Sequence, residues 1–164
     1  MANSIFALIC VDVEPDSPFF GGRPHNDFGP QKWLGVEKGI PRFIKHRGSL
    51  ERSLNCRIPV TWFFRSDAQI AENCGCAAYA LTTNSSVVET LLHQGDEVAW
   101  HAHTWRWSGK KHAWYQEIND GQWIESCLEL GFREYVQATG SLPFSFRAGW
   151  YFHCNKSMAV LDRL

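Results

Sequence analysis

Two histidines separated by one residue follow a short apolar run in the middle of the chain. The run Glu97–Trp100 is typical of a buried strand, and His101 and His103 stand at its end. Imidazole is the commonest protein ligand for zinc and similar metals. Two imidazoles at the end of a strand need one carboxylate to form an open catalytic metal site. The pattern therefore predicts a metal centre, although residues at this spacing also share one face of any continuing strand.

The size and charge of the chain limit the classes of protein and partner that we consider. The 164 residues are 45% hydrophobic and 20% charged, which is typical of one folded domain over residues 1–164. The formal net charge is −1, so no broad basic field favours nucleic acid, and no basic amphipathic run favours a membrane surface. The start of the chain has no basic leader, and the apolar run Ile5–Val11 is too short to cross a bilayer. We therefore expect a cytoplasmic protein with neither nucleic acid nor membrane as a partner.

Six cysteines are scattered along the chain and, without a secretory signal, are expected to be free thiols. Cys74 and Cys76 could hold a structural metal, but no second cysteine or histidine pair stands at finger-like spacing. The two histidines are therefore the stronger candidates for a metal site.

Apolar segments of two kinds alternate along the chain. Continuous apolar runs predict buried strands at 4–13, 58–65, 97–100 and 144–147. Helical spacing and capping residues predict helices at 34–54, at 87–93, at 120–139 and in a last segment that runs to Leu164. Residues 68–80 suit either short helices or a loop, and loops are expected at 14–31 and 104–118. The alternation predicts an α/β fold with a parallel sheet and right-handed crossovers.

Residues that can do chemistry stand at the same end of these strands. Asp12 and Glu14 follow the first strand, the two histidines follow the third, and Arg147 and Trp150 follow the fourth. The carboxyl ends of parallel strands meet at one edge of a sheet, where such folds place their active sites. The same positions also suit helix caps and loop anchors, and that alternative stays open.

Aromatic residues are concentrated in the second half of the chain. Most of the eight tryptophans fall after residue 99. Aromatic faces bind sugars and other flat apolar groups, but large aromatic side chains also fill cores. Trp105, Trp150 and Tyr151 are the candidates for contact with a substrate.

Four segments, in this order, resemble the motifs of the polysaccharide deacetylases, also called the NodB-homology domain or carbohydrate esterase family four. They are Val11–Glu14 for the first motif, Val60–Phe64 for the strand often ending in TFF, Gly95–His101 for the GHEIGxH motif, and Phe146–Tyr151 for the FRxPxG-like motif. The resemblance covers essentially the whole chain. It implies an incomplete deacetylase-type (β/α) barrel, because the chain ends at Leu164, soon after the FRxPxG-like motif.

The resemblance implies a metal-dependent amide hydrolase that removes N-acetyl groups from an amino sugar or polysaccharide. Carried onto this chain, Asp12 would be the general base, and Arg147 would orient it. Val13 stands where the family has a second acid, so Glu14 would be the carboxylate ligand. His101 would be the first histidine ligand.

The resemblance leaves several assignments open. The family's second histidine usually stands four residues after the first, where this chain has Trp105, so His103 is expected to be the second ligand. Asp16 is an alternative to Glu14. The ion is expected to be divalent, with zinc first and cobalt or nickel as alternatives. The general acid is left open among His25, His112 and His153.

The early end of the chain also predicts an open edge. Without later strands, the apolar strand Ile5–Val11 would lie at the edge of the sheet, and long hydrophobic edges invite pairing with another chain. We expect a homodimer that covers this edge, or a fragment whose remaining part lies elsewhere. The alternatives to deacetylation are an inactive sugar-binding or interaction module, a truncated remnant of a deacetylase, and a metal hydrolase of another amide.

Overall fold

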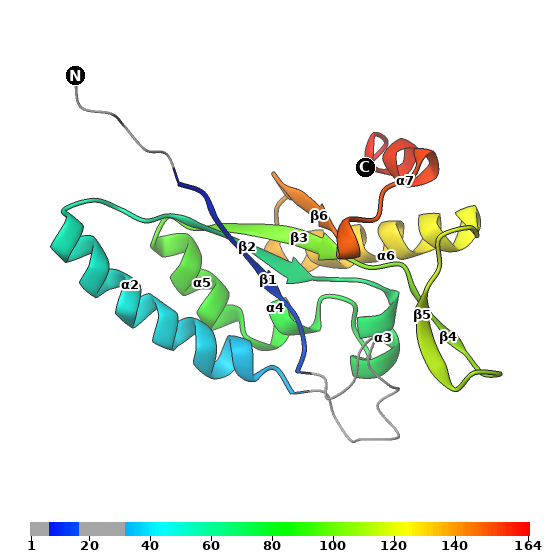
Figure 1. Cartoon of the computed structure of the whole chain (residues 1–164), viewed down its shortest axis with the longest axis horizontal. Helices are drawn as coiled ribbons and strands as arrows, with labels where there is room; N and C mark the ends of the chain where they lie inside the picture. Colours follow the sequence, from blue (N-terminus) through cyan, green and yellow to red (C-terminus); the bar gives the residue numbers. More distant parts are fainter. Residues whose placement is uncertain (1–6, 17–31) are drawn as a thin grey trace.

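Four parallel strands form the main sheet of the protein (Figure 1). The computed structural model describes residues 7–16 and 32–164. The strands follow the order β1-β2-β3-β6 and comprise Ile9–Val13 (β1), Val60–Arg65 (β2), Glu97–Ala102 (β3) and Phe146–Ala148 (β6). The α/β class and all four predicted strands are confirmed, except that residues 4–6 of the first prediction lie outside the described residues.

Helices fill the connections between the strands, as the alternation predicts. They are the π-helical turn η1 (Gly35–Gly39), α2 (Ile40–Leu54), α3 (Ala68–Cys74), α4 (Tyr79–Thr83), α5 (Ser85–His93), α6 (Gly121–Thr139), the 3-10 turn η2 (Gly149–Tyr151) and α7 (Asn155–Leu161). The segment 68–80, which the sequence left open, forms α3 and the start of α4. Within the described ranges, none of the helices is both long and apolar enough to cross a membrane.

Helix α6 packs closely against the strand that carries the histidines. Its Asp120 cap accepts hydrogen bonds from two backbone N–H groups of the first turn, and Gly140 ends it with a φ of +70°. The Tyr135 hydroxyl donates to the carbonyl of Val98 in β3 at 2.8 Å. A Cβ atom at Gly131 would lie 2.3 Å from a backbone oxygen at the end of β2, so this close approach requires glycine.

The two faces of the sheet differ in chemistry. One face packs against the helices through the buried apolar residues Trp62, Phe64, Val98 and Trp100. The intervening residues point to the opposite face, because side chains alternate along a strand. On that face the strand register aligns Arg65, His101 and Arg147 in one row.

The sheet curls toward the face that carries this row. Asp12 belongs to β1 and Arg147 to β6, the two outer strands, yet Arg147 Nη1 lies 2.6 Å from Asp12 Oδ1. Neighbouring strands lie about 4.8 Å apart, so the outer strands of a flat sheet would be separated by about three times that distance. Contact between these side chains across two intervening strands requires strong curvature. The four strands therefore form a half-barrel.

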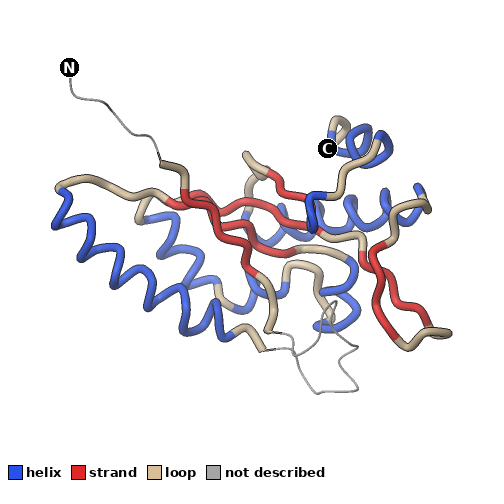
Figure 2. The backbone as a smooth tube through the Cα atoms, viewed as in Figure 1, coloured by secondary structure: helices blue, strands red, loops and turns tan. Residues whose placement is uncertain are grey.

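A β-hairpin replaces the loop predicted at 104–118, so that prediction was wrong. Strands β4 (Trp105–Ser108) and β5 (Ala113–Gln116) pair antiparallel and project at one end of the molecule, apart from the main sheet (Figure 2). Trp107 lies directly opposite Trp114, with ring centroids 5.7 Å apart. Cross-strand aromatic pairs stabilise such hairpins.

Strand β1 forms one edge of the sheet, as predicted, and among the described residues it pairs with β2 alone. Ile9, Cys10 and Val11 are only half-buried, so the prediction of a strand buried on both faces was wrong for β1. The physical reason is the edge position, which leaves one side of the strand without a partner there. Leu8, just before the strand, is 82% exposed.

We expect two chains to pair in solution along the β1 edge. Size-exclusion chromatography with light scattering should then give twice the 18.8 kDa mass of one chain. The variant Leu8→Lys should shift the protein toward the single-chain mass, because charged side chains on a sheet edge oppose pairing with another strand. Leu54→Lys, at an exposed leucine that ends α2, is the matched control and should leave the mass unchanged. A parent protein with the mass of one chain contradicts this expectation.

Candidate metal centre

Three ligand atoms from two separate parts of the chain converge at the carboxyl ends of the strands. Glu14 follows β1, His101 lies in β3, and His103 stands just past the end of β3. Glu14 Oε1 lies 2.9 Å from Nε2 of each histidine, and the two Nε2 atoms are 3.1 Å apart. The structure therefore brings together the three residues that the sequence predicted as metal ligands, and such a group can bind a metal ion.

The orientation of His101 is set by a backbone group. Its Nδ1 lies 2.8 Å from the carbonyl oxygen of Arg147, which is opposite His101 in the register of β3 and β6. A carbonyl oxygen only accepts hydrogen bonds, so Nδ1 carries the proton of the neutral ring. The lone pair of Nε2 is thereby directed at Glu14. Metal-binding histidines are usually held by such a hydrogen bond from the other ring nitrogen.

The spacing and chemistry of the three atoms fit a zinc-like ion. Zinc binds nitrogen and carboxylate oxygen at about 2.0–2.2 Å, so tetrahedral ligand atoms lie about 3.3 Å apart, within a few tenths of an ångström of the distances here. With the His101 proton on Nδ1, its Nε2 and Glu14 Oε1 are two acceptors in contact at 2.9 Å. A cation between them removes this repulsion. Two nitrogens and one oxygen also leave a coordination position for water or substrate.

His103 is held by packing as well as by its neighbours. Its ring stacks on Trp105 with centroids 5.8 Å apart, and its backbone N–H donates to Asp67 Oδ2 at 3.0 Å. A Cβ atom at Gly149 would lie 2.2 Å from the ring, so only glycine fits there. Burial is the largest influence on His103 and lowers its pKa, although the hydrogen bond with Glu14 acts in the opposite direction. The lowered pKa favours the neutral form of the ring, which is the form that binds metal.

Glu14 is held in its ionised form by a buried cation. Burial by itself would raise its pKa, but the positive charge of Arg65 is the largest influence in the opposite direction and lowers it. The pKa of Glu14 is therefore well below its usual range. Arg65 Nη1 contacts Glu14 Oε2 at 2.7 Å, which leaves Oε1 to face the histidines.

The predicted base and its partner also come together. Arg147 Nη1 contacts Asp12 Oδ1 at 2.6 Å, and the guanidinium lies over the ring of Phe63 at 4.1 Å from its centroid. Asp12 and Glu14 are two residues apart at the end of β1, so they point to the same face of the sheet. The Asp12 side chain is partly exposed, which leaves the carboxylate accessible to a substrate.

Two of the three predicted substrate-contact residues, Trp105 and Trp150, pack together, and the third, Tyr151, follows Trp150 in the chain. Trp105 is only 4% exposed, so its ring supports His103 from inside the protein instead of forming an open platform. Trp150 packs edge-on against Trp105 with centroids 4.8 Å apart and is 50% exposed, and Tyr151 is 84% exposed. The exposed aromatic surface here therefore belongs to Trp150 and Tyr151.

Other candidates from the sequence lie elsewhere. Asp16, the alternative carboxylate, accepts a hydrogen bond from the backbone N–H of Leu34 at 3.1 Å and so holds the entry to η1. His112 lies in the turn of the hairpin, and His153 is exposed beside Phe146. His25 lies outside the described residues. Cys74 and Cys76 belong to no metal-binding group found among residues 7–16 and 32–164.

Sequence reasoning missed three residues around Glu14: Arg65, Asp67 and Gln69. Arg65 donates to all three of the carboxylate and amide groups that surround it, on Glu14, Asp67 and Gln69. The one signal in the sequence was Arg65 itself, a charged residue at the end of an otherwise apolar strand. That signal is also typical of an ordinary loop anchor, so it did not identify a site residue.

No protein-family model, no curated protein and no solved structure matches the chain. The geometry of the site and the motifs of the sequence are therefore the only indications of function.

Replacing Gly149 by alanine should disturb the metal centre without altering any ligand. The added methyl group would meet the His103 ring and displace it. We expect zinc affinity, measured by competition with a chelating dye, to fall about ten- to hundred-fold, as it does when residues that support a ligand are changed. Gly109→Ala, where a Cβ atom meets nothing within 4 Å, is the control and should bind zinc as the parent does. Equal affinities for the two variants would contradict this role of Gly149.

Proposed function

We propose that the protein is a metal-dependent amide hydrolase that removes N-acetyl groups from an amino sugar or polysaccharide. The observation that carries this proposal is the convergence of Glu14, His101 and His103 on one point, on the same face of the sheet as the Asp12–Arg147 pair. A two-histidine, one-carboxylate group with an open position is the ligand set of metal-dependent hydrolases. A separate carboxylate nearby supplies the base that such a reaction needs.

The order of motifs supports the same class. The half-barrel has the residues of the deacetylase-like motifs at the carboxyl ends of its strands, where the polysaccharide deacetylases that the sequence resembles have their active site. On this proposal the fold is an incomplete deacetylase-type barrel. The ion is zinc, with cobalt or nickel as alternatives, because imidazole and carboxylate ligands suit these metals.

The ion, when bound, would polarise the acetyl carbonyl and make water a stronger nucleophile. Asp12 would accept a proton from the attacking water, since it is the partly exposed carboxylate beside the site. Arg147 would orient Asp12, because its guanidinium is fixed between that carboxylate and Phe63. The reaction adds water across the C–N bond and yields acetate and a free amine.

The exposed aromatic rings favour a sugar as the carrier of the acetyl group. Trp150 and Tyr151 lie on the turn after β6, and Trp150 packs against Trp105, which stacks on His103. Aromatic faces pack well against the apolar faces of sugar rings. A sugar held on Trp150 would therefore lie next to the metal centre.

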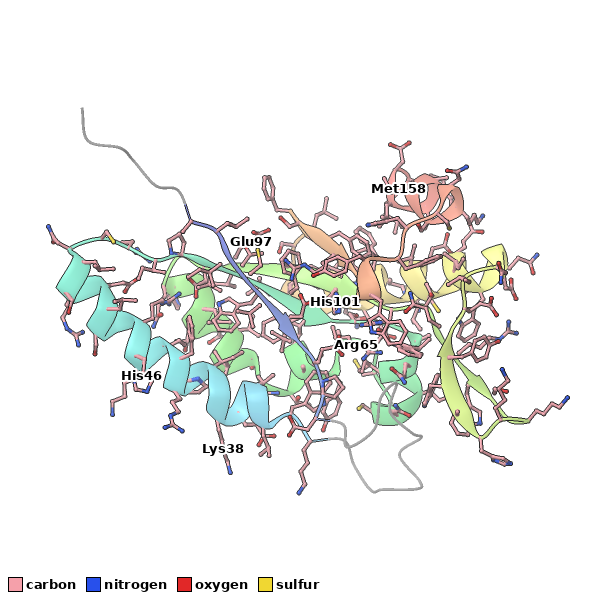
Figure 3. The ribbon with its side chains drawn as sticks, in the orientation of Figure 1. Lys38, His46, Arg65, Glu97, His101 and Met158 are labelled. Atoms are coloured by element: carbon pink, nitrogen blue, oxygen red, sulfur yellow. The ribbon has the colours of Figure 1, made fainter. Side chains whose placement is uncertain are left out.

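Metal content is the first test of this proposal. Protein purified without chelator and supplied with zinc should hold about one ion per chain by elemental analysis, since the three ligands form a single site. His101→Ala should lose the ion. The control His46→Ala changes an exposed histidine on α2, far from His101 (Figure 3), and should keep it. A parent protein that binds no zinc contradicts the hydrolase, and sugar binding without metal would favour the inactive sugar-binding module.

Asp12→Asn should separate catalysis from metal binding. The substitution keeps the shape of the side chain but removes its ability to accept a proton, so acetate release from acetylated chito-oligosaccharides should fall about 10²- to 10⁴-fold. The zinc content should stay at the parental level, because Asp12 is not a ligand. Asp16→Asn, at the carboxylate that holds the entry to η1, is the control and should retain activity. Unchanged acetate release in Asp12→Asn would exclude Asp12 as the base.

A further inference from the structure

Arg65 is a buried cation at the end of β2, next to the candidate metal centre. It is 5% exposed, and the strand register places it directly opposite His101 (Figure 3). Its guanidinium donates to Glu14 Oε2 at 2.7 Å, to Asp67 Oδ2 at 2.7 Å, and to the side-chain oxygen of Gln69. Each of the three guanidinium nitrogens therefore donates a hydrogen bond, and together these bonds fix the position of the group.

Asp67 connects this arginine to the second half of the site. Its carboxylate is fully buried, and its Oδ2 accepts from both Arg65 Nε and the backbone N–H of His103. Its Oδ1 accepts from the backbone N–H of Ile70 and caps α3. One carboxylate therefore fixes the backbone of a histidine ligand and, through Arg65, the side chain of the carboxylate ligand.

We propose that Arg65, supported by Asp67, is the positioning residue that makes Glu14 a one-oxygen ligand. Arg65 engages Oε2 of Glu14, and only Oε1 is left to face the two histidines. The inference rests on the proposed metal centre and adds to it a residue that determines which ions the centre accepts. The sequence gives no role to Arg65 in that centre.

The consequence is a preference for small ions with few ligands. A carboxylate that binds through one oxygen suits a four-coordinate ion such as zinc. Larger, harder cations favour carboxylates that bind through both oxygens and more ligands in total. With Oε2 engaged by Arg65, the site cannot supply that second oxygen. Arg65 therefore selects zinc-like ions and keeps a position open for the substrate.

The variant Arg65→Lys tests positioning apart from charge. Lysine keeps the positive charge, but its single ammonium group cannot hold Glu14, Asp67 and Gln69 in the planar fork of a guanidinium. Glu14 would then be free to rotate and to bind an ion through both oxygens. We expect zinc affinity to fall about ten- to hundred-fold. The visible absorption of the cobalt-loaded variant should also lose the intensity of a four-coordinate ion and become that of a five- or six-coordinate ion.

Arg47 offers a matched control. It is also 5% exposed, and it pairs with the buried carboxylate of Asp96 and the side chain of Gln94. It lies on α2, and none of its hydrogen-bond partners belongs to the metal centre. Arg47→Lys should therefore lower the melting temperature, as Arg65→Lys should, but leave the cobalt spectrum and the zinc affinity at parental values.

The outcomes separate the two proposals. A parent protein that binds neither zinc nor cobalt overturns the metal centre, and the role of Arg65 with it. A parent that binds both ions, together with an Arg65→Lys variant of unchanged spectrum and affinity, overturns the role of Arg65 alone. If Arg65→Lys does not fold, a crystal structure of the zinc-loaded parent decides. One Glu14 oxygen on zinc and the other on Arg65 supports the proposal, and two oxygens on zinc overturn it.

Discussion

The curvature of the parallel sheet is the constraint on which the candidate site depends. Glu14 follows β1 and His101 lies in β3, and β2 runs between these strands, yet their side-chain atoms are 2.9 Å apart. The same curvature brings Asp12 of β1 within 2.6 Å of Arg147 of β6. In a flat sheet the backbones that carry these groups lie two and three strand spacings apart, and their side chains stand roughly perpendicular to the sheet instead of converging. Curling therefore turns a row of unconnected strand ends into one group of interacting side chains.

The sheet assigns stability and chemistry to opposite faces. Trp62 and Trp100 of the sheet and Tyr135 of α6 belong to the core between the sheet and the helices. Apolar burial of this kind is the main favourable contribution to folding. The other face contains Arg65 and Asp67, whose burial is unfavourable unless each charge is paired. Each is paired here, and their contacts lead to the predicted ligands. The buried polar residues thus lie where they orient the predicted ligands. The apolar face contributes the stability that offsets the unfavourable burial of these charges.

Much of this arrangement could be predicted from local patterns. Apolar runs and helical spacing identified the parallel sheet, and polar residues at strand ends identified Glu14, His101 and Arg147. The contributions of Arg65 and Gly149 could not be predicted, because both depend on contacts between segments far apart in the chain. The hairpin at β4 and β5 was missed because its strands meet through cross-strand contacts such as the Trp107–Trp114 pair, which the sequence does not distinguish from two separate aromatic residues. Periodicity predicts elements and their order, whereas register and close approach determine the site.

The turn after β6 shows how one close approach affects both the metal centre and the aromatic surface. Gly149 lies against the His103 ring where no side chain fits, and the chain turns sharply at the two residues that follow. Trp150 and Tyr151 have φ values of +55°, a left-handed conformation that costs non-glycine residues about 1–2 kcal/mol each. Such a conformation persists only where the surroundings impose it. Trp150 then packs on Trp105, which stacks on His103, so the exposed aromatic surface and the histidine ligand are parts of one packed unit.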